Sequence, residues 1–141
     1  MVRFLFLIFV AFSSCKLDSN KEIKKTYYSD EKIKSIKPYV NDSIDGQVQN
    51  FYTSGVLKEI ISYKHNKKNG MAYYFYPSGA LQKFRHWRDN IQNGYVCDYY
   101  DDTVGIIKTV ILFDNMGKTV YKKHFDSLGN FISEEGIHPT Q

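Results

Sequence analysis

Apolar and glycine positions recur along this chain with a period of 24 residues. In each copy an Asn-Gly or Asp-Gly pair is followed, after four variable residues, by an aromatic residue and a tyrosine. A second glycine comes next, and another aromatic residue stands eight positions after it. The three clear copies begin at Gly46, Gly70 and Gly94, and the third carries a two-residue insertion. Self-similarity at such a period is the signature of a repeat architecture.

Each half of a copy is expected to form one β-strand bounded by turn residues. Tyr76-Pro77-Ser78-Gly79 fits a type I turn, with proline at the second position and glycine at the fourth. The Asn-Gly pairs at 69–70 and 93–94 add residues that tolerate positive φ. Strands about 12 residues apart therefore follow one another as hairpins. The sequence predicts an all-β protein, an elongated antiparallel β-meander of repeated hairpins over residues 22–135, preceded by a helical signal segment.

The alternation along the strands leaves open which face of the sheet forms the core. In a regular strand Leu57 and Tyr63, an even number of positions apart, point to the same face, whereas Ile60 points to the other face. Both faces are therefore expected to carry apolar side chains, unless bulges shift the pattern. Pro38, in a degenerate copy over residues 22–45, suits an edge strand, which needs fewer amide donors.

Two sets of aromatic residues recur at equivalent positions. The set that closes the second half of each copy, Tyr63, Trp87 and Phe113, is expected to form a buried ladder, because its members stay large while their polarity varies. The tyrosines that close the first half should keep their hydroxyl groups near water or a backbone partner. The repeat aromatics are Tyr52, Tyr63, Tyr76, Trp87, Tyr100, Phe113 and Phe125. The turn glycines are Gly46, Gly55, Gly70, Gly79, Gly94, Gly105, Gly117 and Gly129.

The first residues have the anatomy of a secretory signal. Arg3 precedes an apolar run from Phe4 to Phe12, which is too short to span a hydrocarbon core of ~30 Å. Ser13-Ser14-Cys15 follows and resembles the lipobox of bacterial lipoproteins, in which the signal is cut before a cysteine that receives lipid. The resemblance implies lipid attachment at Cys15 and an exported, membrane-anchored lipoprotein facing the periplasm or cell surface. An ordinary secretory signal, cut elsewhere, is the alternative.

The repeat itself resembles the bacterial variant of the MORN repeat, and the resemblance covers roughly residues 46–130. It implies an elongated array of β-hairpins. Many members are secreted lipoproteins of unknown activity, and some carry an antitoxin label. The chain divides on this basis into a lipoprotein signal peptide (1–14), a lipidated tether (15–21), a degenerate N-terminal capping repeat (22–45), three repeats (46–69, 70–93 and 94–119) and a degenerate C-terminal hairpin and tail (120–141).

The composition supports strands and gives little sign of nucleic-acid binding. The chain has 12 Tyr, 10 Phe and 1 Trp, and its formal net charge is +4, too weakly basic to indicate nucleic acid. Basic residues interleave with tyrosines in the middle repeats, which makes them a candidate strip for an anionic partner, a glycan or a lipid headgroup. The alternative is that they keep the sheet soluble. The strip comprises Lys64, Lys67, Lys68, Tyr73, Tyr74, Arg85, Arg88, Tyr95 and Tyr99.

The sequence offers no constellation typical of catalysis or metal binding. The histidines, His65, His86, His124 and His138, are far apart and lack neighbours at metal-ligand spacing. Cys97 is a candidate nucleophile with His86 or His124, but a packed thiol is the favoured interpretation. Adjacent carboxylates in turns rarely form the opposed pair that a glycosidase needs. The carboxylate pairs are Asp30-Glu31, Asp101-Asp102 and Glu134-Glu135. We expect no catalytic residue, no metal and no cofactor.

Three functions remain. The favoured one is a non-enzymatic, lipid-anchored binding or scaffold module of the cell envelope, which contacts the membrane through lipid on Cys15 and binds an unknown protein or glycan. The second is an antitoxin-like or immunity protein that binds a specific partner protein. The third is an uncharacterised hydrolase, which is disfavoured because an antiparallel sheet without inserted loops offers little concavity.

Overall fold

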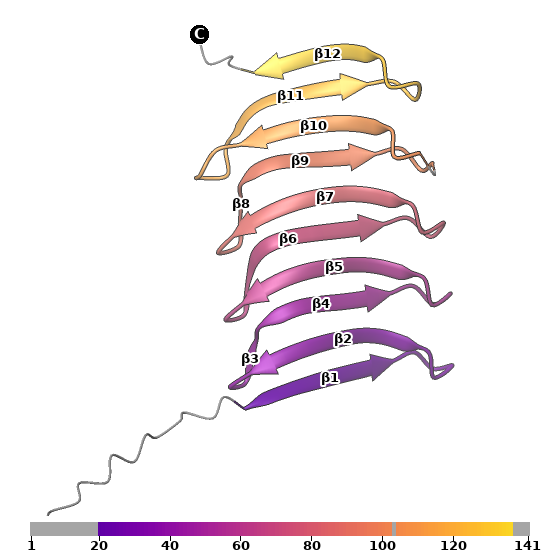
Figure 1. Ribbon diagram of the computed structural model, residues 1–141, viewed down its shortest axis with the longest axis vertical. Helices are drawn as coiled ribbons and strands as arrows, with labels where there is room; N and C mark the ends of the chain where they lie inside the picture. The colour runs from indigo at the N-terminus through magenta and orange to yellow at the C-terminus, as the bar shows by residue number, and fades with distance from the viewer. Residues whose placement is uncertain (1–19, 103, 137–141) are drawn as a thin grey trace, which may run out of the picture.

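The computed structural model describes residues 20–102 and 104–136, whose regular structure is entirely β (Figure 1). A helix with the length and hydrophobicity needed to span a membrane is not found among them. The expected signal segment and Cys15 lie outside the described residues. The strands are β1 (Lys21–Tyr27), β2 (Ile33–Val40), β3 (Ser43–Ile44), β4 (Gly46–Phe51), β5 (Leu57–Lys64), β6 (Lys67–Phe75), β7 (Leu81–Arg88), β8 (Ile91–Gln92), β9 (Gly94–Tyr99), β10 (Ile107–Phe113), β11 (Thr119–Phe125) and β12 (Phe131–Gly136).

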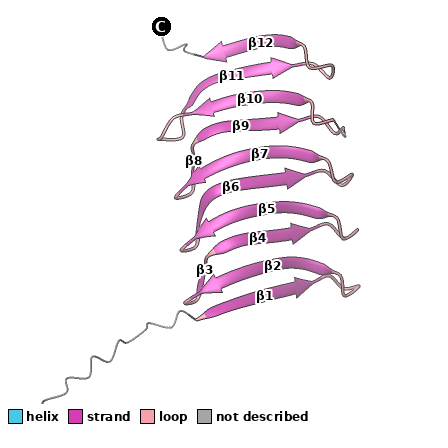
Figure 2. Cartoon of the chain, in the orientation of Figure 1, coloured by secondary structure: helices cyan, strands magenta, loops and turns pink. Residues whose placement is uncertain are grey.

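The strands form one open antiparallel sheet in the order β1-β2-β4-β5-β6-β7-β9-β10-β11-β12. The short strands β3 and β8 pair with β2 and β7. Figure 2 shows strands alternating with loops in a single layer from one edge to the other. The predicted all-β antiparallel meander is therefore confirmed.

Pro38 does not lie in an edge strand, and that expectation is wrong. It lies in β2, opposite Ile23, between the residues that pair with β4 and those that pair with β3. Because β2 changes partners at this point, the missing amide of Pro38 removes no ladder bond toward β4.

The turn predicted at Tyr76 is present. The amide of Gly79 donates to the carbonyl of Tyr76, and the amide of Tyr76 donates to the carbonyl of Ala80, both at 2.9 Å. All eight predicted turn glycines have a positive φ, between 72° and 117°. In the first turn of this kind Glu31 takes the place of the glycine, with φ 64°, and its amide donates to the carbonyl of Tyr28 at 3.1 Å.

The other rim of the sheet has two-residue turns in which both residues have positive φ. These turns are Asn41-Asp42, His65-Asn66 and Asp89-Asn90. The Asn-Gly pairs at 69–70 and 93–94 are therefore not the turns: Asn69-Gly70 lies inside β6, and Gly94 opens β9. Gly70 and Gly94 do have the positive φ expected of them, 102° and 72°. The turns themselves use Asn, Asp and His residues, which also tolerate this conformation and stand a few residues earlier in the sequence.

The asparagines of these turns connect neighbouring hairpins. The amide of Asn66 donates to the carbonyl of Ile44 at 2.9 Å, and the amide of Ile44 donates to Oδ1 of Asn66 at 2.7 Å. The same reciprocal contact joins Asn90 with Lys68, and Asn41 with Asn20. Each turn is thus fixed to the strand that lies one hairpin earlier.

The most deeply buried apolar side chains are of small or medium size. Val48, Ile61, Ala72 and Val96 are at most 5% exposed. Val48 lies opposite Ile61, which lies opposite Ala72, so these residues share what we call the Val48 face. The residues between them, Ile60 among them, point to the opposite face, which we call the Phe84 face because Phe84 lies in the same cross-strand row. Both faces carry apolar residues, as expected.

The aromatic residues near the ends of β5, β7 and β10 lie opposite glycines. A glycine leaves room for a ring to lie across the neighbouring strand. The pairs are Gly46 with Tyr63, Gly70 with Trp87, and Gly94 with Phe113. All three rings are only half-buried. The expectation that this ladder is the buried core is therefore wrong: the sheet has one layer, so solvent lies over large side chains, and the shorter row beside them is buried instead.

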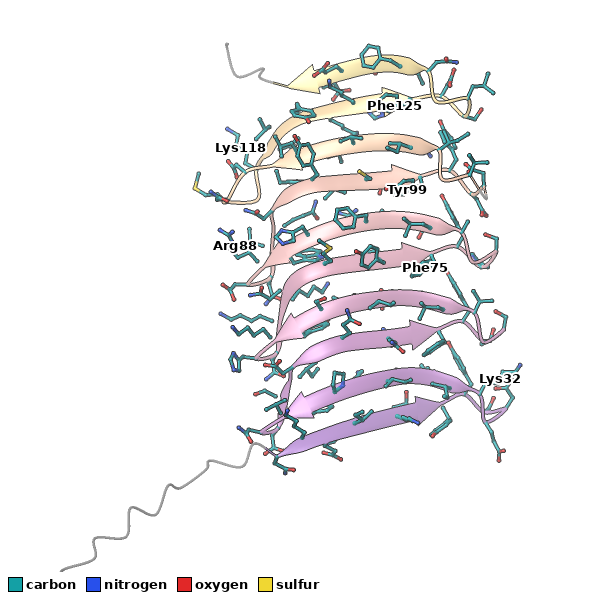
Figure 3. All side chains as sticks on the ribbon, viewed as in Figure 1. Lys32, Phe75, Arg88, Tyr99, Lys118 and Phe125 are labelled. Atoms are coloured by element: carbon teal, nitrogen blue, oxygen red, sulfur yellow. The ribbon has the colours of Figure 1, made fainter. Side chains whose placement is uncertain are left out.

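The tyrosines that close the first half of each copy tie one hairpin to the next. Each hydroxyl donates to a main-chain carbonyl one repeat further along, at 2.6–2.9 Å, which confirms the expected backbone partner. The bonds run from Tyr28 to Phe51, Tyr52 to Phe75, Tyr76 to Tyr99, and Tyr100 to Phe125. Figure 3 labels three acceptors, Phe75, Tyr99 and Phe125, one above another along the stack.

Phe125 stands eight positions after Gly117, as Trp87 does after Gly79, and this spacing predicts that the two aromatic residues are equivalent. The structure instead makes Phe125 the counterpart of Phe75. β11 runs antiparallel to β10, and the turn at Gly117 lies at the rim of the two-residue turns (Lys118 in Figure 3). An aromatic residue stands eight positions after a glycine in strands of both directions. This spacing alone therefore does not show in which direction a strand runs.

Candidate binding faces

One cross-strand row on the Val48 face is polar from edge to edge. Neighbours in this row bind each other: Oγ1 of Thr26 lies 2.7 Å from Oγ of Ser35, and Nδ2 of Asn50 donates to Oε1 of Glu59 at 2.6 Å. The row consists of Thr26, Ser35, Asn50, Glu59, Tyr74, Lys83, Asp98, Thr109, His124 and Ser133. Several of its polar groups thus stabilise the sheet itself.

The matching row on the Phe84 face is charged at both ends and largely apolar between them. The rings of Tyr73 and Phe84 lie 5.5 Å apart between centroids. Beside this row, Met71 and Tyr95 are 48% and 54% exposed. The row consists of Lys25, Ile36, Gln49, Ile60, Tyr73, Phe84, Cys97, Val110, Lys123 and Glu134. An accessible apolar strip of this kind is typical of an interaction surface.

The predicted strip of basic residues and tyrosines is divided among three places. Consecutive residues of a strand point to opposite faces, so neighbours in the sequence are separated by the sheet. Tyr73, Tyr95 and Tyr99 lie on the Phe84 face; Lys68, Tyr74 and Arg85 lie on the Val48 face; and Lys64, Lys67 and Arg88 lie at the rim of the two-residue turns (Arg88 in Figure 3).

Two of the basic side chains of this strip already have partners within the sheet. Nζ of Lys68 lies 4.7 Å from the ring centroid of Trp87, a distance typical of a cation–π contact. Nη1 of Arg85 donates to Oε1 of Gln92 at 2.6 Å. The structure therefore does not bring the nine residues together into one basic, aromatic surface.

The hollows along the sheet are open to solvent. One on the Val48 face has a volume of about 220 Å³, and its lining includes Tyr76, Lys83, Asp98 and Thr109. Nζ of Lys83 lies 3.4 Å from Oδ1 of Asp98 inside it. Two larger hollows, of about 420 and 410 Å³, lie beside the edge strand β1. This geometry suits contact with an extended surface better than enclosure of a small ligand.

Cys97 lies in the middle of the apolar row on the Phe84 face. Burial raises the pKa of its thiol, so the protonated form dominates at neutral pH, whereas the thiolate is the reactive form. His124 lies opposite Thr109 on the Val48 face, across the sheet from Cys97. His86 shares the Phe84 face, where it lies opposite Met71. The environment of Cys97 is thus that of a packed thiol.

The carboxylate pairs stabilise turns and edges. Oδ1 of Asp102 accepts the amides of Val104, Gly105 and Ile106 at 2.7–3.3 Å, and Asp101 accepts a hydrogen bond from Ser78 at 2.5 Å. Asp30 pairs with Lys32, and Glu134 with Lys123, at 2.9 and 3.6 Å. Within residues 20–102 and 104–136, no group of three or more His, Cys, Asp or Glu side chains could hold a metal ion. His138 lies outside this part of the chain.

No known family model and no curated protein matches this sequence. Two solved structures that match are of TarM. A mutant of S. aureus TarM in complex with fondaparinux, alpha-GlcNAc-glycerol and UDP is 10% identical, with a TM-score of 0.45, over 82% of this chain and 20% of TarM. A second TarM structure is 12% identical, with a TM-score of 0.42, over 77% and 18%. This chain therefore spans only about a fifth of TarM, and likeness at this level says nothing about activity.

Sequence reasoning missed the edge-to-edge rows, because they depend on the register of nine successive strand pairs. It also missed the opposite charges of the two edge strands. That signal is present in the sequence, as Lys21, Lys24 and Lys25 near the start of the sheet and Glu134 and Glu135 at its end. The charge difference can be interpreted only when these segments are known to form the two edge strands of the described sheet.

Proposed function

We propose that this chain is a non-enzymatic binding or scaffold module, built of MORN-like repeats and held at the cell envelope by lipid on Cys15. The observation that carries the binding role is the apolar row of the Phe84 face. Its residues from Ile36 to Val110 are half-buried, along a sheet with a single layer. A partner with an extended apolar surface, such as another protein, would cover this row and remove it from water.

The binding role is tested by placing a photo-crosslinking residue at Met71 or Tyr95 in the full chain, expressed in its own envelope. Both positions flank the apolar row, so both are expected to crosslink to the same partner. Ser54 and Lys67 are matched controls, because both are exposed and lie away from the row, Ser54 in a turn and Lys67 at the rim end of β6. Equal crosslinking from the control positions would show that the Phe84 face is not the binding surface.

A second measurement asks whether the row contributes affinity. Met71→Lys and Tyr95→Lys place charges beside the apolar row at positions that are already about half exposed, so the fold should tolerate them. We expect both variants to lose most of the crosslinked partner, while Lys67→Glu keeps it. Unchanged capture by both lysine variants would contradict the proposal.

The anchoring role is tested separately by mass spectrometry of the native protein. Lipid on a mature N-terminal Cys15 is the expected result, and Cys15→Ala should leave an uncleaved or soluble form. An unmodified cysteine at position 15 would refute the anchor without bearing on the binding face.

A further inference from the structure

Among the described residues, the sheet ends in two edge strands, β1 and β12, and these edges have opposite charge. All seven residues of β1 are exposed, and they include Lys21, Lys24 and Lys25 against one acidic residue, Glu22. β12 carries Glu134 and Glu135 and no basic residue. Its apolar residues are also accessible: Phe131 and Ile132 are 57% and 60% exposed. An exposed edge strand is a template for pairing with another strand.

The two edges also match in direction and register. Counting both edge strands, ten strands follow one another across the sheet, and each is antiparallel to the next. β1 and β12 therefore point in opposite directions. A β1 placed beside β12 would therefore be antiparallel to it, like every other pair in the sheet. Along a cross-strand row, hydrogen-bonded residue pairs alternate with non-hydrogen-bonded pairs. Because each molecule contributes an even number of strands to the row, a pair between β12 and the next β1 continues this alternation.

The cross-strand rows fix which residues would meet. The row on the Phe84 face begins at Lys25 and ends at Glu134, and the polar row on the Val48 face begins at Thr26 and ends at Ser133. Continued in the same register, Glu134 of one molecule would face Lys25 of the next, and Ser133 would face Thr26. Each contact repeats one inside the sheet, where Lys123 pairs with Glu134 and Thr26 with Ser35.

We propose that copies of this chain associate head to tail, with β12 of one copy pairing with β1 of the next and extending the sheet. The charges select this pairing over the others. β1 against β1 would oppose lysines, and β12 against β12 would oppose glutamates; like charges directly opposite each other destabilise a strand pair. Because the two edges differ, the contact does not close on itself and generates open chains of molecules.

The first test is sedimentation velocity of the full chain in mild detergent over a concentration series. We expect the wild-type sedimentation coefficient to rise with concentration. Lys24→Glu combined with Lys25→Glu should raise the concentration needed for association by about tenfold or more, as should Glu134→Lys combined with Glu135→Lys. A mixture of the two variants should associate again, because each acidic edge then meets a basic one.

The matched control reverses two exposed rim lysines, Lys64→Glu combined with Lys67→Glu, which changes the net charge by the same amount away from the edges. This control should associate like the wild type. A wild type that stays monomeric at every concentration would overturn the proposal. Association of the Lys24→Glu, Lys25→Glu variant at wild-type concentrations would overturn it as well.

A crosslinking experiment avoids charge reversal and tests the register. In a Cys97→Ala background, in which the proposed lipid occupies the thiol of Cys15, Lys25→Cys and Glu134→Cys are made in separate chains. Directly opposite residues of antiparallel strands have Cβ atoms about 4.5–5.5 Å apart, close enough for disulfide formation with small adjustments. Mixing should give disulfide-linked dimers that neither variant forms alone. Dimers of Lys25→Cys alone, in equal yield, would show that the edges meet otherwise.

Discussion

At the scale of single residues, the sheet depends on backbone conformations that most side chains avoid. Glu31 occupies, with φ 64°, a turn position that glycine holds in other repeats. A residue with a side chain loses about 1–2 kcal/mol in this region, while glycine adopts it but has more freedom in the unfolded chain. Glu31→Gly is therefore expected to raise the free energy of unfolding by roughly 1 kcal/mol in chemical denaturation.

Gly79→Ala is the matched control for this substitution. Gly79 has φ 92°, and a Cβ atom added there meets nothing within 4 Å, so the substitution tests backbone conformation alone. It should lower the free energy of unfolding by about 1 kcal/mol. The two variants are thus expected to differ in sign, and a Glu31→Gly protein less stable than the wild type would contradict the assignment.

Trp87 tests how much a half-buried ring contributes to a one-layer sheet. It lies opposite Gly70 under the ammonium group of Lys68, and its indole N–H has no hydrogen-bond partner among the described residues. Trp87→Ala should cost about 3 kcal/mol, the low end of the range for aromatic truncation. Trp87→Phe should cost much less, because Phe113 has the equivalent place opposite Gly94.

The quick check for this residue is the fluorescence of the sole tryptophan. We expect emission at shorter wavelength than that of free tryptophan in water, with a shift to the free value on unfolding. A Trp87→Ala protein as stable as the wild type would mean that the ring serves binding and not the fold.

At the scale of elements, the tyrosine hydroxyl groups join successive hairpins. The hydroxyl of Tyr76 donates to the carbonyl of Tyr99 at 2.9 Å. Tyr76→Phe keeps the ring and removes the donor, so it should lower the free energy of unfolding by about 0.5–1.5 kcal/mol. Tyr73→Phe is the control, because that hydroxyl donates to the side-chain sulfur of Met71 in the same strand and does not join two hairpins. Equal effects of the two substitutions would argue against the inter-hairpin bond.

The last two turns predict how stability depends on pH. The pKa of Asp114 is lowered chiefly by a hydrogen bond from the amide of Lys118. The pKa of Asp126 is lowered chiefly by a hydrogen bond from the side chain of Asn130. A lowered folded-state pKa contributes stability that is present above the unfolded value near 3.9 and is lost as the pH falls through the folded value. The wild type should therefore lose more thermal stability below about pH 4 than a variant with Asp114→Asn and Asp126→Asn. Parallel melting-temperature profiles of the two proteins would contradict this.

The elements were predictable where a local signal suffices, and the surfaces were not. The glycine-closed turns could be predicted because proline and glycine fix φ locally, as at Pro77 and Gly79. The sequence also indicates a turn between strands around His65, but not its exact two residues, since Asn69-Gly70 is a stronger turn signal than His65-Asn66. The basic, aromatic strip failed for a different reason: which face a residue such as Arg85 occupies depends on register across several strands, and bulges change that register near the strand ends.

At the scale of the whole molecule, each strand is stabilised only by its neighbours in the sheet, as in other one-dimensional repeat arrays. β6 has two full-length partners, whereas β1 and β12 have one each. The tyrosine bonds and the asparagine contacts both reach across to the next hairpin, and they couple these units along the stack. The array should therefore be most stable in its middle and least stable at its edges.

Hydrogen exchange of the full chain, followed by mass spectrometry, measures this gradient. Amides exchange through local opening, so at low protein concentration we expect the slowest exchange in β5 to β7 and the fastest in β1 and β12. Edge pairing between copies adds a second expectation: protection of β1 and β12 should rise together as concentration increases, while that of β6 stays constant. Protection that rises in one edge strand alone would contradict a contact that uses both edges. Uniform protection from β1 to β12 at low concentration would contradict the gradient itself.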